Sequence, residues 1–178
     1  IHFFTKKIKS KFISIGAQNC HYHQSYGPFT GSLNAAMIKK VGAKYVILGH
    51  SENRMEGETN RLIKKKIQSA LNENINIIFC IGETTKEKRS GKTFSIISKQ
   101  ILSSIEKKFK INKIIFAYEP VWSIGTGVTP KAEELKKIFC FIRKQIKKIF
   151  RLKKFPTVLY GGSVNPRNIK LFSSIYEI

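Results

Sequence analysis

The chain has 178 residues, of which 42% are apolar, so it is long and apolar enough for one globular domain with a buried core. Its 33 lysines and arginines against 11 acidic residues give a formal charge of +22, which raises the possibility of a nucleic-acid partner. However, the chain has no aspartate and is rich in Ile, Lys, Asn and Phe, as A/T-rich codons would produce. We therefore expect no nucleic-acid partner. We also expect no membrane association, because no apolar run is long enough to span a bilayer.

Five near-continuous apolar runs predict short parallel strands that are covered on both faces. These runs are Phe12–Ala17, Lys44–Gly49, Asn76–Gly82, Lys113–Glu119 and Thr157–Gly161. Apolar residues at helical spacing predict amphipathic helices between and after them. The predicted helices are Ala35–Val41, Asn60–Asn74, Thr93–Phe109, Pro130–Phe150 and Pro166–Phe172. This alternation predicts a single α/β domain over residues 1–178, built on a parallel sheet.

The three cysteines are widely spaced, and no pair has the spacing of a zinc or redox motif. We interpret Cys20, Cys80 and Cys140 as buried or half-buried free thiols. Free thiols favour a reducing compartment, so we expect a cytoplasmic location.

Polar residues follow several predicted strands, at the edge where a parallel sheet binds ligands. His50, Glu52, Glu83 and Glu119 all lie there. His50 precedes the start of a helix, whose partial positive charge favours a neutral imidazole that can donate a hydrogen bond. Glu119 would point into an apolar pocket, where burial raises the pKa of a carboxyl and makes it a better base near neutrality. The alternatives are a core histidine and a structural ion pair.

Two glycine-containing segments follow the last two predicted strands. Pro120–Val128 carries Trp122 and Ile124 on a loop, as expected of a lid that closes on a ligand, and its glycines would let backbone N–H groups approach an anion. Tyr160–Asn165 places two glycines before a predicted helix, an arrangement that suits phosphate. The alternatives are an ordinary packed loop and a tight turn.

Several of these segments together resemble the triosephosphate isomerase family in order and approximate spacing. They are GAQN (Gly16–Asn19), GPFTG (Gly27–Gly31), GHSENR (Gly49–Arg54), CIGET (Cys80–Thr84), AYEPVWSIGTG (Ala117–Gly127) and YGGSVN (Tyr160–Asn165). The resemblance implies a (β/α)8 TIM barrel. It also implies the interconversion of dihydroxyacetone phosphate and glyceraldehyde 3-phosphate through an enediolate, in glycolysis and gluconeogenesis, without a metal or organic cofactor.

The resemblance also implies a role for each matching catalytic residue. Glu119 resembles the base that shuttles a proton between adjacent substrate carbons. His50 resembles the neutral electrophile that hydrogen-bonds the substrate oxygens, and Glu52 resembles a nearby supporting carboxylate. Gly125 and Ser163 resemble backbone N–H donors to the substrate phosphate.

Further roles concern the lid and the dimer. Trp122 and Ile124 resemble lid residues, Glu83 resembles a partner of Trp122, and Cys80 matches a structural cysteine. The loop 20–31 resembles the arm that enters a partner subunit in the family's homodimer, where Thr30 would help to complete the other active site.

The chain departs from the family pattern at three positions. Ser32 and Asn53 stand where the family usually has a paired Glu and Arg, so both charges are lost together and the dimer loop is expected to be looser. Val128 stands where the family favours Lys, and the segment after Gly127 is shorter, which puts the C-terminal hinge of the lid in doubt.

The resemblance covers about five of the eight strand–helix units of a barrel, ending at Ile178 before the eighth strand. The family's Asn–Lys pair on the first strand and its glycine pair after the eighth have no counterpart. Losing such a cation costs roughly 10²–10³ in rate, so we expect these 178 residues alone to be inactive or impaired. A non-catalytic decayed remnant or scaffold is the main alternative. A basic nucleic-acid-binding protein is a more distant one.

Overall fold

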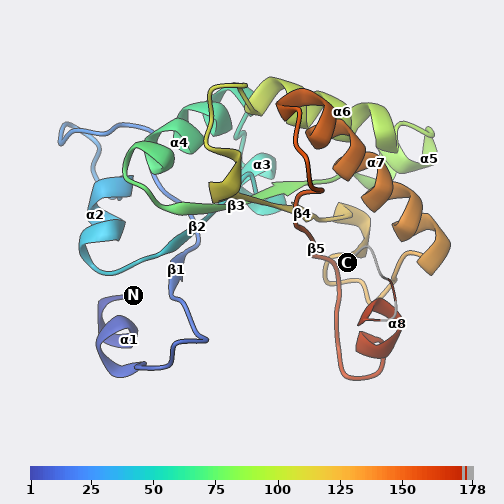
Figure 1. Cartoon of the computed structure of the whole chain (residues 1–178), viewed down its shortest axis with the longest axis horizontal. Coiled ribbons are helices and arrows are strands. Elements are labelled where there is room, and N and C mark those ends of the chain that lie inside the picture. The colour runs from blue at the N-terminus through green and yellow to red at the C-terminus, as the bar shows by residue number, and fades with distance from the viewer. Residues whose placement is uncertain (174, 176–178) are drawn as a thin grey trace.

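The computed structural model describes residues 1–173 and 175, and its centre is a parallel sheet in the order β1-β2-β3-β4-β5 (Figure 1). The strands are β1 (Gly16–Ala17), β2 (Tyr45–Leu48), β3 (Asn76–Ile81), β4 (Ile114–Tyr118) and β5 (Val158–Tyr160). Because every connection joins neighbouring parallel strands, the sheet is one sector of a (β/α) barrel. The predicted α/β fold is confirmed. Ile178, where the resemblance ends, lies outside the described residues.

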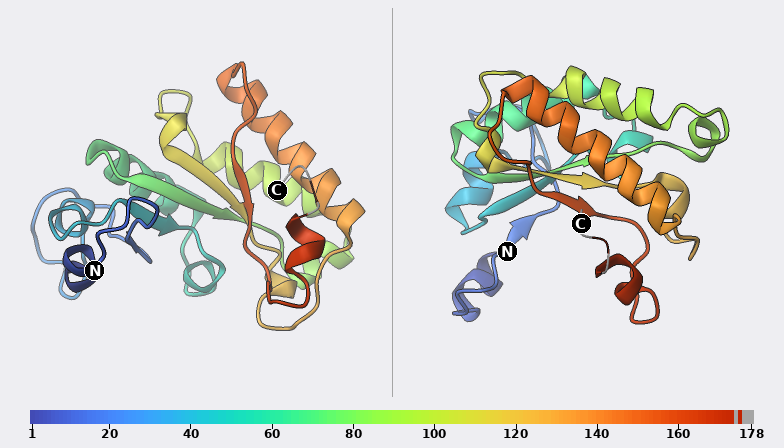
Figure 2. Two further views of the ribbon diagram at one scale, coloured as in Figure 1. Left: turned by 60° about the horizontal axis from the view of Figure 1, so that its bottom comes forward. Right: turned by 45° about the vertical axis from the view of Figure 1, so that its right-hand side comes forward.

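Three of the helices, α4, α6 and α7, cover one face of the sheet (Figures 1 and 2). The helices are α1 (His2–Lys7), α2 (Ala35–Lys40), α3 (Ser51–Met55), α4 (Asn60–Asn72), α5 (Thr85–Arg89), α6 (Thr93–Ser104), α7 (Ala132–Phe150) and α8 (Ile169–Ser173). The apolar stripe of α7 accounts for its position, since it buries Leu135, Ile138, Phe139, Ile142 and Ile146.

Three predicted helices are longer than the observed ones. The local backbone conformation ends α4 and α6 earlier than predicted and makes α8 begin later. Helix α4 ends at Asn72, and Asn74 then takes a left-handed conformation with a φ of 58°. Helix α6 ends at Ser104 rather than Phe109, because the next residue is already extended. Helix α8 begins at Ile169 rather than Pro166, since the side chain of Asn165 accepts backbone hydrogen bonds from the residues that follow and forms a turn.

The predicted strand Phe12–Ala17 is wrong over most of its length. Only Gly16 and Ala17 are in a strand, and Phe12 is fully exposed. Within the described residues β1 pairs with β2 alone, so it is an edge strand. Residues before Gly16 have no continuous ladder to join, and their apolar side chains alone do not hold them extended.

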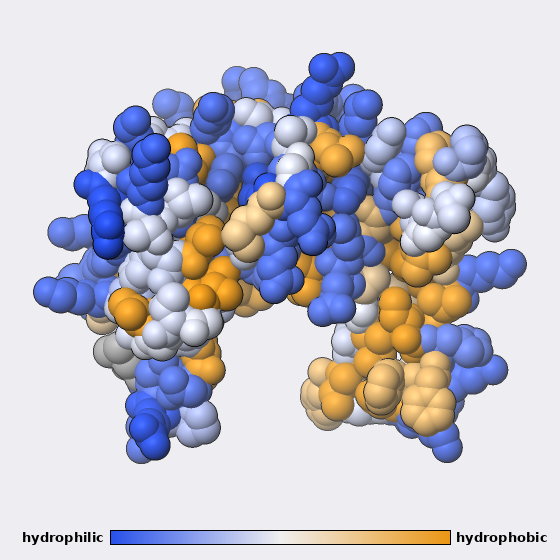
Figure 3. Space-filling model, turned by 180° about the vertical axis from the view of Figure 1, so that it is seen from behind, coloured by the Kyte–Doolittle hydropathy of each residue, from blue (hydrophilic) through white to orange (hydrophobic). Residues whose placement is uncertain are grey.

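The sheet face opposite the helices is only partly covered, which contradicts the prediction that both faces are covered. Val46 and Phe116 face the helices and are completely buried. In contrast, Ile47 and Ile78, which are paired across β2 and β3, are only half-buried, and Leu159 of β5 is 39% exposed. Figure 3 shows this face as the hollow of an arch, with apolar side chains gathered on one of its two legs. Phe3 and Phe4 of α1, and Phe12 and Ile13 between α1 and β1, are exposed.

Helix α6 holds the end of β3 through the buried side chain of Gln100. Its Nε2 donates to the carbonyl oxygen of Gly82 at 2.9 Å, and its Oε1 accepts from the N–H of Gly82 at 2.8 Å. Both backbone groups lie just beyond the last strand residue, where the ladder no longer satisfies them.

Replacing Gln100 with leucine is expected to lower the free energy of unfolding by about 2–4 kcal/mol, because two buried backbone groups lose their partners. Urea denaturation of the protein would measure this loss. Gln68→Leu is the matched control, since the side chain of Gln68 bonds to that of Asn72 near the surface rather than to a buried backbone group. Equal stability of the Gln100 and Gln68 variants would show that Gln100 does not hold the strand end.

Candidate active site

Glu119 lies between the ends of three strands, and two glycines make room for it. Its N–H donates to the carbonyl oxygen of Ile81 at 2.8 Å. A Cβ on Gly82 would lie 1.9 Å from the carbonyl oxygen of Glu119, and a Cβ on Gly161 would lie 2.7 Å from its Cγ. Only glycine permits so close an approach at these two positions. The backbone of β3 and β5 therefore fixes where the carboxyl group of Glu119 lies.

The carboxyl group of Glu119 is buried and only partly satisfied. Glu119 is 7% exposed, and its Oε2 is buried without a hydrogen-bond partner among the described residues. Burial raises the pKa of Glu119, and this effect outweighs the opposing contributions of the Cys80 thiol hydrogen bond and of nearby His50. A carboxyl group with a raised pKa is a candidate proton acceptor in acid–base chemistry.

His50 caps helix α3 and faces Glu119. Its Nδ1 accepts a hydrogen bond from the N–H of Glu52 at 3.3 Å, which assigns the proton of the neutral ring to Nε2. The Nε2 atom lies 3.6 Å from Oε1 of Glu119. The prediction that a helix starts directly after His50 is confirmed, and the ring presents an N–H toward the space beside Glu119.

Glu52 has a different environment from Glu119. Its Oε2 lies 3.6 Å from Nδ1 of His50, a distance too long for a hydrogen bond, and its side chain is 77% exposed. The structure thus brings His50, Glu52 and Glu119 together at one end of the sheet. Of the two carboxylates, Glu119 is shielded from water and Glu52 is not.

The loop after Glu119 is anchored through its tryptophan. Trp122 lies in a short 3-10 turn, Val121–Ser123, and its Nε1 donates to Oε1 of Glu83 at 2.9 Å. The hydroxyl of Tyr118 contacts both oxygens of Glu83 at 3.1 Å. Glu83 is completely buried, and burial raises its pKa despite these hydrogen bonds. The predicted pairing of Glu83 with Trp122 is present.

A lysine packs on the other side of the same tryptophan. The Nζ of Lys88 lies 3.5 Å from the ring centroid of Trp122 and 2.6 Å from Oε1 of Glu134. This cation–π contact connects the loop to α5 and α7. No motif in the sequence singled out Lys88, because it lies on a short helix that periodicity did not detect.

The two predicted phosphate-binding segments meet at Ser123. The hydroxyl of Ser163 donates to the carbonyl oxygen of Ser123 at 2.5 Å, and the hydroxyl of Ser123 donates to the carbonyl oxygen of Val128 at 2.5 Å. Ile124 follows and is half-buried. Gly125 then forms the exposed tip, with a φ of 69° that favours glycine. The loop is therefore fixed at its base and open at its tip.

Asn53 and Ser32, two departures from the family pattern, lie at or near the loop 20–31. Asn53 accepts a hydrogen bond at 3.0 Å from Nδ2 of Asn19, a neutral contact at a position where the family usually has a charge. Ser32 is exposed. Thr30 is also exposed on this loop, and its contribution to a partner's active site remains a prediction.

Sequence reasoning assigned no role to Arg54, although it lies in one of the matching motifs. Its Nε donates to the carbonyl oxygen of Gly49 at 2.7 Å, and an Nη donates to that of Cys80 at 3.2 Å. Arg54 therefore joins the ends of β2 and β3 beneath the candidate site. No local pattern marks these contacts, because they form only when β2 and β3 lie side by side.

A barrel sector with a buried carboxylate and a histidine at the carboxyl ends of its strands defines an α/β enzyme fold with a candidate acid–base site. The family model described as triosephosphate isomerase matches residues 1–178. The triosephosphate isomerase of Dictyoglomus thermophilum is 42% identical over 98% of this chain and 72% of its own length. That of Aquifex aeolicus is 43% identical over 97% and 71%. The chain belongs to the triosephosphate isomerase family.

A solved structure supports the same assignment. The crystal structure of triosephosphate isomerase from Bartonella henselae superimposes with a TM-score of 0.87 at 30% identity. It covers 99% of this chain, and this chain covers 73% of it. The partial-barrel fold is therefore that of the family's enzymes.

Proposed function

We propose that the protein interconverts dihydroxyacetone phosphate and glyceraldehyde 3-phosphate by proton transfer through an enediolate. The proposal depends above all on Glu119, whose carboxyl group is buried and has a raised pKa. Its Oε1 lies 3.6 Å from the Nε2 of His50, and its Oε2 has no hydrogen-bond partner among the described residues. A base and a hydrogen-bond donor 3.6 Å apart can act on a substrate in which the C–H bond to be broken is next to a carbonyl group. The base removes the proton, and the donor bonds to the carbonyl oxygen.

In this mechanism Glu119 removes a proton from one substrate carbon and returns it to the neighbouring carbon. The Nε2–H of His50 stabilises the charge that develops on the substrate oxygens. Glu52 supports His50 from the solvent side, since its backbone N–H already bonds to Nδ1 and its carboxylate lies nearby.

The remaining site residues bind phosphate and exclude water. The backbone N–H groups of Gly125 and Ser163 would bind the substrate phosphate, as the loop that bears Gly125 is tied at Ser123 to the loop that bears Ser163. Trp122 and Ile124 would cover the intermediate when the lid closes. We propose that this chemistry uses no metal and no organic cofactor.

We further propose a homodimer in the cytoplasm. The loop 20–31 is largely exposed, with Tyr26 at 78%, and Thr30 on it would reach the partner's active site. The three free cysteines are compatible with a reducing compartment. Among the described residues no helix has both the length and the apolar character needed to cross a membrane.

The proposed reaction can be tested in D2O with protein expressed from the complete reading frame that contains this chain. Because a carboxyl proton exchanges with solvent, we expect glyceraldehyde 3-phosphate formed from dihydroxyacetone phosphate to carry deuterium at C2. Mass spectrometry would detect it. No turnover by this protein would contradict the proposal and favour the decayed remnant or scaffold.

A polypeptide of these 178 residues alone is expected to show no meaningful turnover, and robust turnover by it would contradict that expectation.

The pKa of Glu119 offers a direct test of its environment. We expect it to titrate above its ordinary value of 4.5, because burial disfavours the charged form. Carbon-13 NMR of labelled glutamate carboxyls, compared with Glu119→Gln, would identify its resonance. Removing the thiol with Cys80→Ala is expected to raise the pKa further, since the Cys80 hydrogen bond lowers it. Titration at or below 4.5 would contradict the assignment of a buried base.

A further inference from the structure

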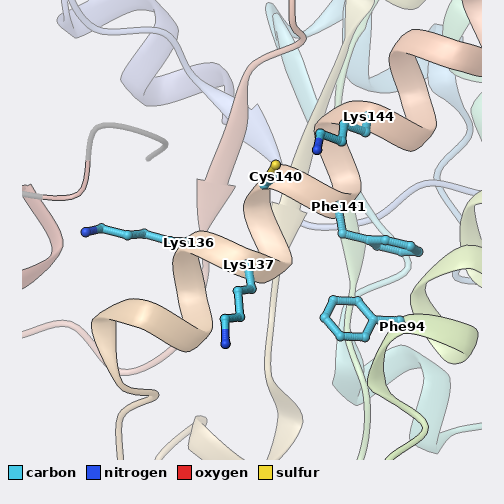
Figure 4. A pocket seen from close by; sticks show the side chains of 6 residues that line it. All are labelled: Phe94, Lys136, Lys137, Cys140, Phe141 and Lys144. Atoms are coloured by element: carbon cyan, nitrogen blue, oxygen red, sulfur yellow. The ribbon is translucent and has the colours of Figure 1, made fainter.

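An apolar groove lies on the outer surface between α6 and α7, outside the candidate active site (Figure 4). Its volume is about 630 Å³, within the range of small-molecule sites. Its lining residues are Phe94, Lys136, Lys137, Cys140, Phe141 and Lys144. None of them takes part in the contacts described above for the proposed isomerase reaction.

The floor of the groove is aromatic and incompletely covered. The rings of Phe94 from α6 and Phe141 from α7 lie 4.9 Å apart at 60°, and Phe94 is 43% exposed. The half-buried thiol of Cys140 lies one residue before Phe141 on α7. Core-type side chains left exposed in a hollow indicate a surface that gains from being covered.

The border of the groove is positively charged. Lys136, Lys137 and Lys144 project from α7, and none of the described carboxylates lines the groove. Lys136 is partly neutralised by Glu133 at 3.1 Å. Within the part of the chain that the structure describes, Lys137 and Lys144 form no ion pair. Two uncompensated cations next to an aromatic floor select for an anion with an apolar body.

We propose that this groove binds a small amphipathic carboxylate, with a planar apolar body against Phe94 and Phe141 and its carboxylate drawn to the positively charged border that bears Lys137 and Lys144. A small inorganic anion would satisfy the lysines but leave the rings exposed, and a neutral aromatic compound would cover the rings without using the charges. The site is independent of the proposed isomerase reaction.

Cys140 makes the proposal measurable. Cys20 and Cys80 are buried, so Cys140 is the thiol of this chain most open to a reagent. Its thiolate attacks 2,2′-dithiodipyridine, forms a mixed disulfide and releases 2-thiopyridone, whose absorbance gives the rate. We expect 2-naphthoate to slow this reaction of the full chain saturably, by at least about fivefold, because it covers the thiol. Uncharged 2-naphthamide at the same concentration is expected to protect far less.

Charge-reversal variants separate specific binding from general attraction to a basic protein. Lys137→Glu with Lys144→Glu is expected to weaken protection by 2-naphthoate about tenfold. Lys40→Glu with Lys107→Glu makes the same change in net charge at two exposed positions elsewhere, one at the end of α2 and one in a turn, and is expected to leave protection unchanged. If the double variant at the groove is unstable, Lys144→Gln tests the same contact. Equal protection by 2-naphthamide, or full protection of the Lys137 and Lys144 variants, would overturn the proposal.

Discussion

Replacing Glu119 with glutamine is expected to lower kcat of the isomerase reaction by roughly 10³-fold, within the range of a lost general base. The amide has nearly the same shape as the carboxyl group, so the close contacts with Gly82 and Gly161 are kept. It cannot accept a proton from carbon, however. The measurement is a coupled assay of the protein expressed from its complete reading frame, with circular dichroism to verify folding.

Two further variants sharpen this test. Glu56→Gln removes one charge from an exposed glutamate and is expected to leave kcat unchanged. Glu119→Asp keeps a carboxyl group but shortens its reach, so its activity is expected to lie between those of the wild type and Glu119→Gln. Equal kcat for Glu119→Gln and the wild type would show that another group is the base.

Replacing Lys66 with methionine is expected to lower the free energy of unfolding by about 3–5 kcal/mol, because it leaves a buried carboxylate without its cation. The Nζ of Lys66 bonds to Oε1 of Glu58 and donates to Oδ1 of Asn19 at 3.0 Å. Lys66 is 8% exposed and Glu58 is 9% exposed. Water therefore cannot replace the lost partner, and urea denaturation would report the full cost.

The paired variant distinguishes loss of the ion pair from loss of packing. Adding Glu58→Leu to Lys66→Met removes the orphaned charge and is expected to recover most of the stability, since buried ion pairs and apolar pairs of similar volume are often equivalent. Lys39→Met is the exposed control, and losing its contact with Glu73 is expected to cost at most about 1 kcal/mol. If Lys39→Met and Lys66→Met cost the same, the buried pair has no special role.

The predicted sheet was accurate at four of its five strands. The runs at β2, β3, β4 and β5 were placed within one residue of the observed strands at each end, because short apolar runs between helical patterns are typical of parallel strands. The prediction failed at Phe12, since a run of apolar residues does not reveal whether a partner strand lies beside it. Helices α1 and α5 were missed because short helices carry too little periodicity.

Candidate site residues were predictable where their types and positions both carry chemistry. A histidine and glutamates directly after apolar strands pointed to one edge of the sheet, and the structure places His50, Glu52 and Glu119 together there. Gln100 and Lys88 were not predictable, because each acts on a residue far away in sequence and no local pattern marks such a contact.

The resemblance to the family, the parallel α/β fold and the residue types at the strand ends can be read from the sequence alone, because they depend on local order and spacing. The environment of the site residues emerged only from the folded structure. That structure showed that glycines after β3 and β5 lie against Glu119, that burial raises its pKa and that its Oε2 has no partner among the residues that the structure describes. The burial of Glu119 and its close contacts with the two glycines arise only when separate strands lie side by side. A sequence pattern along the chain therefore does not reveal them.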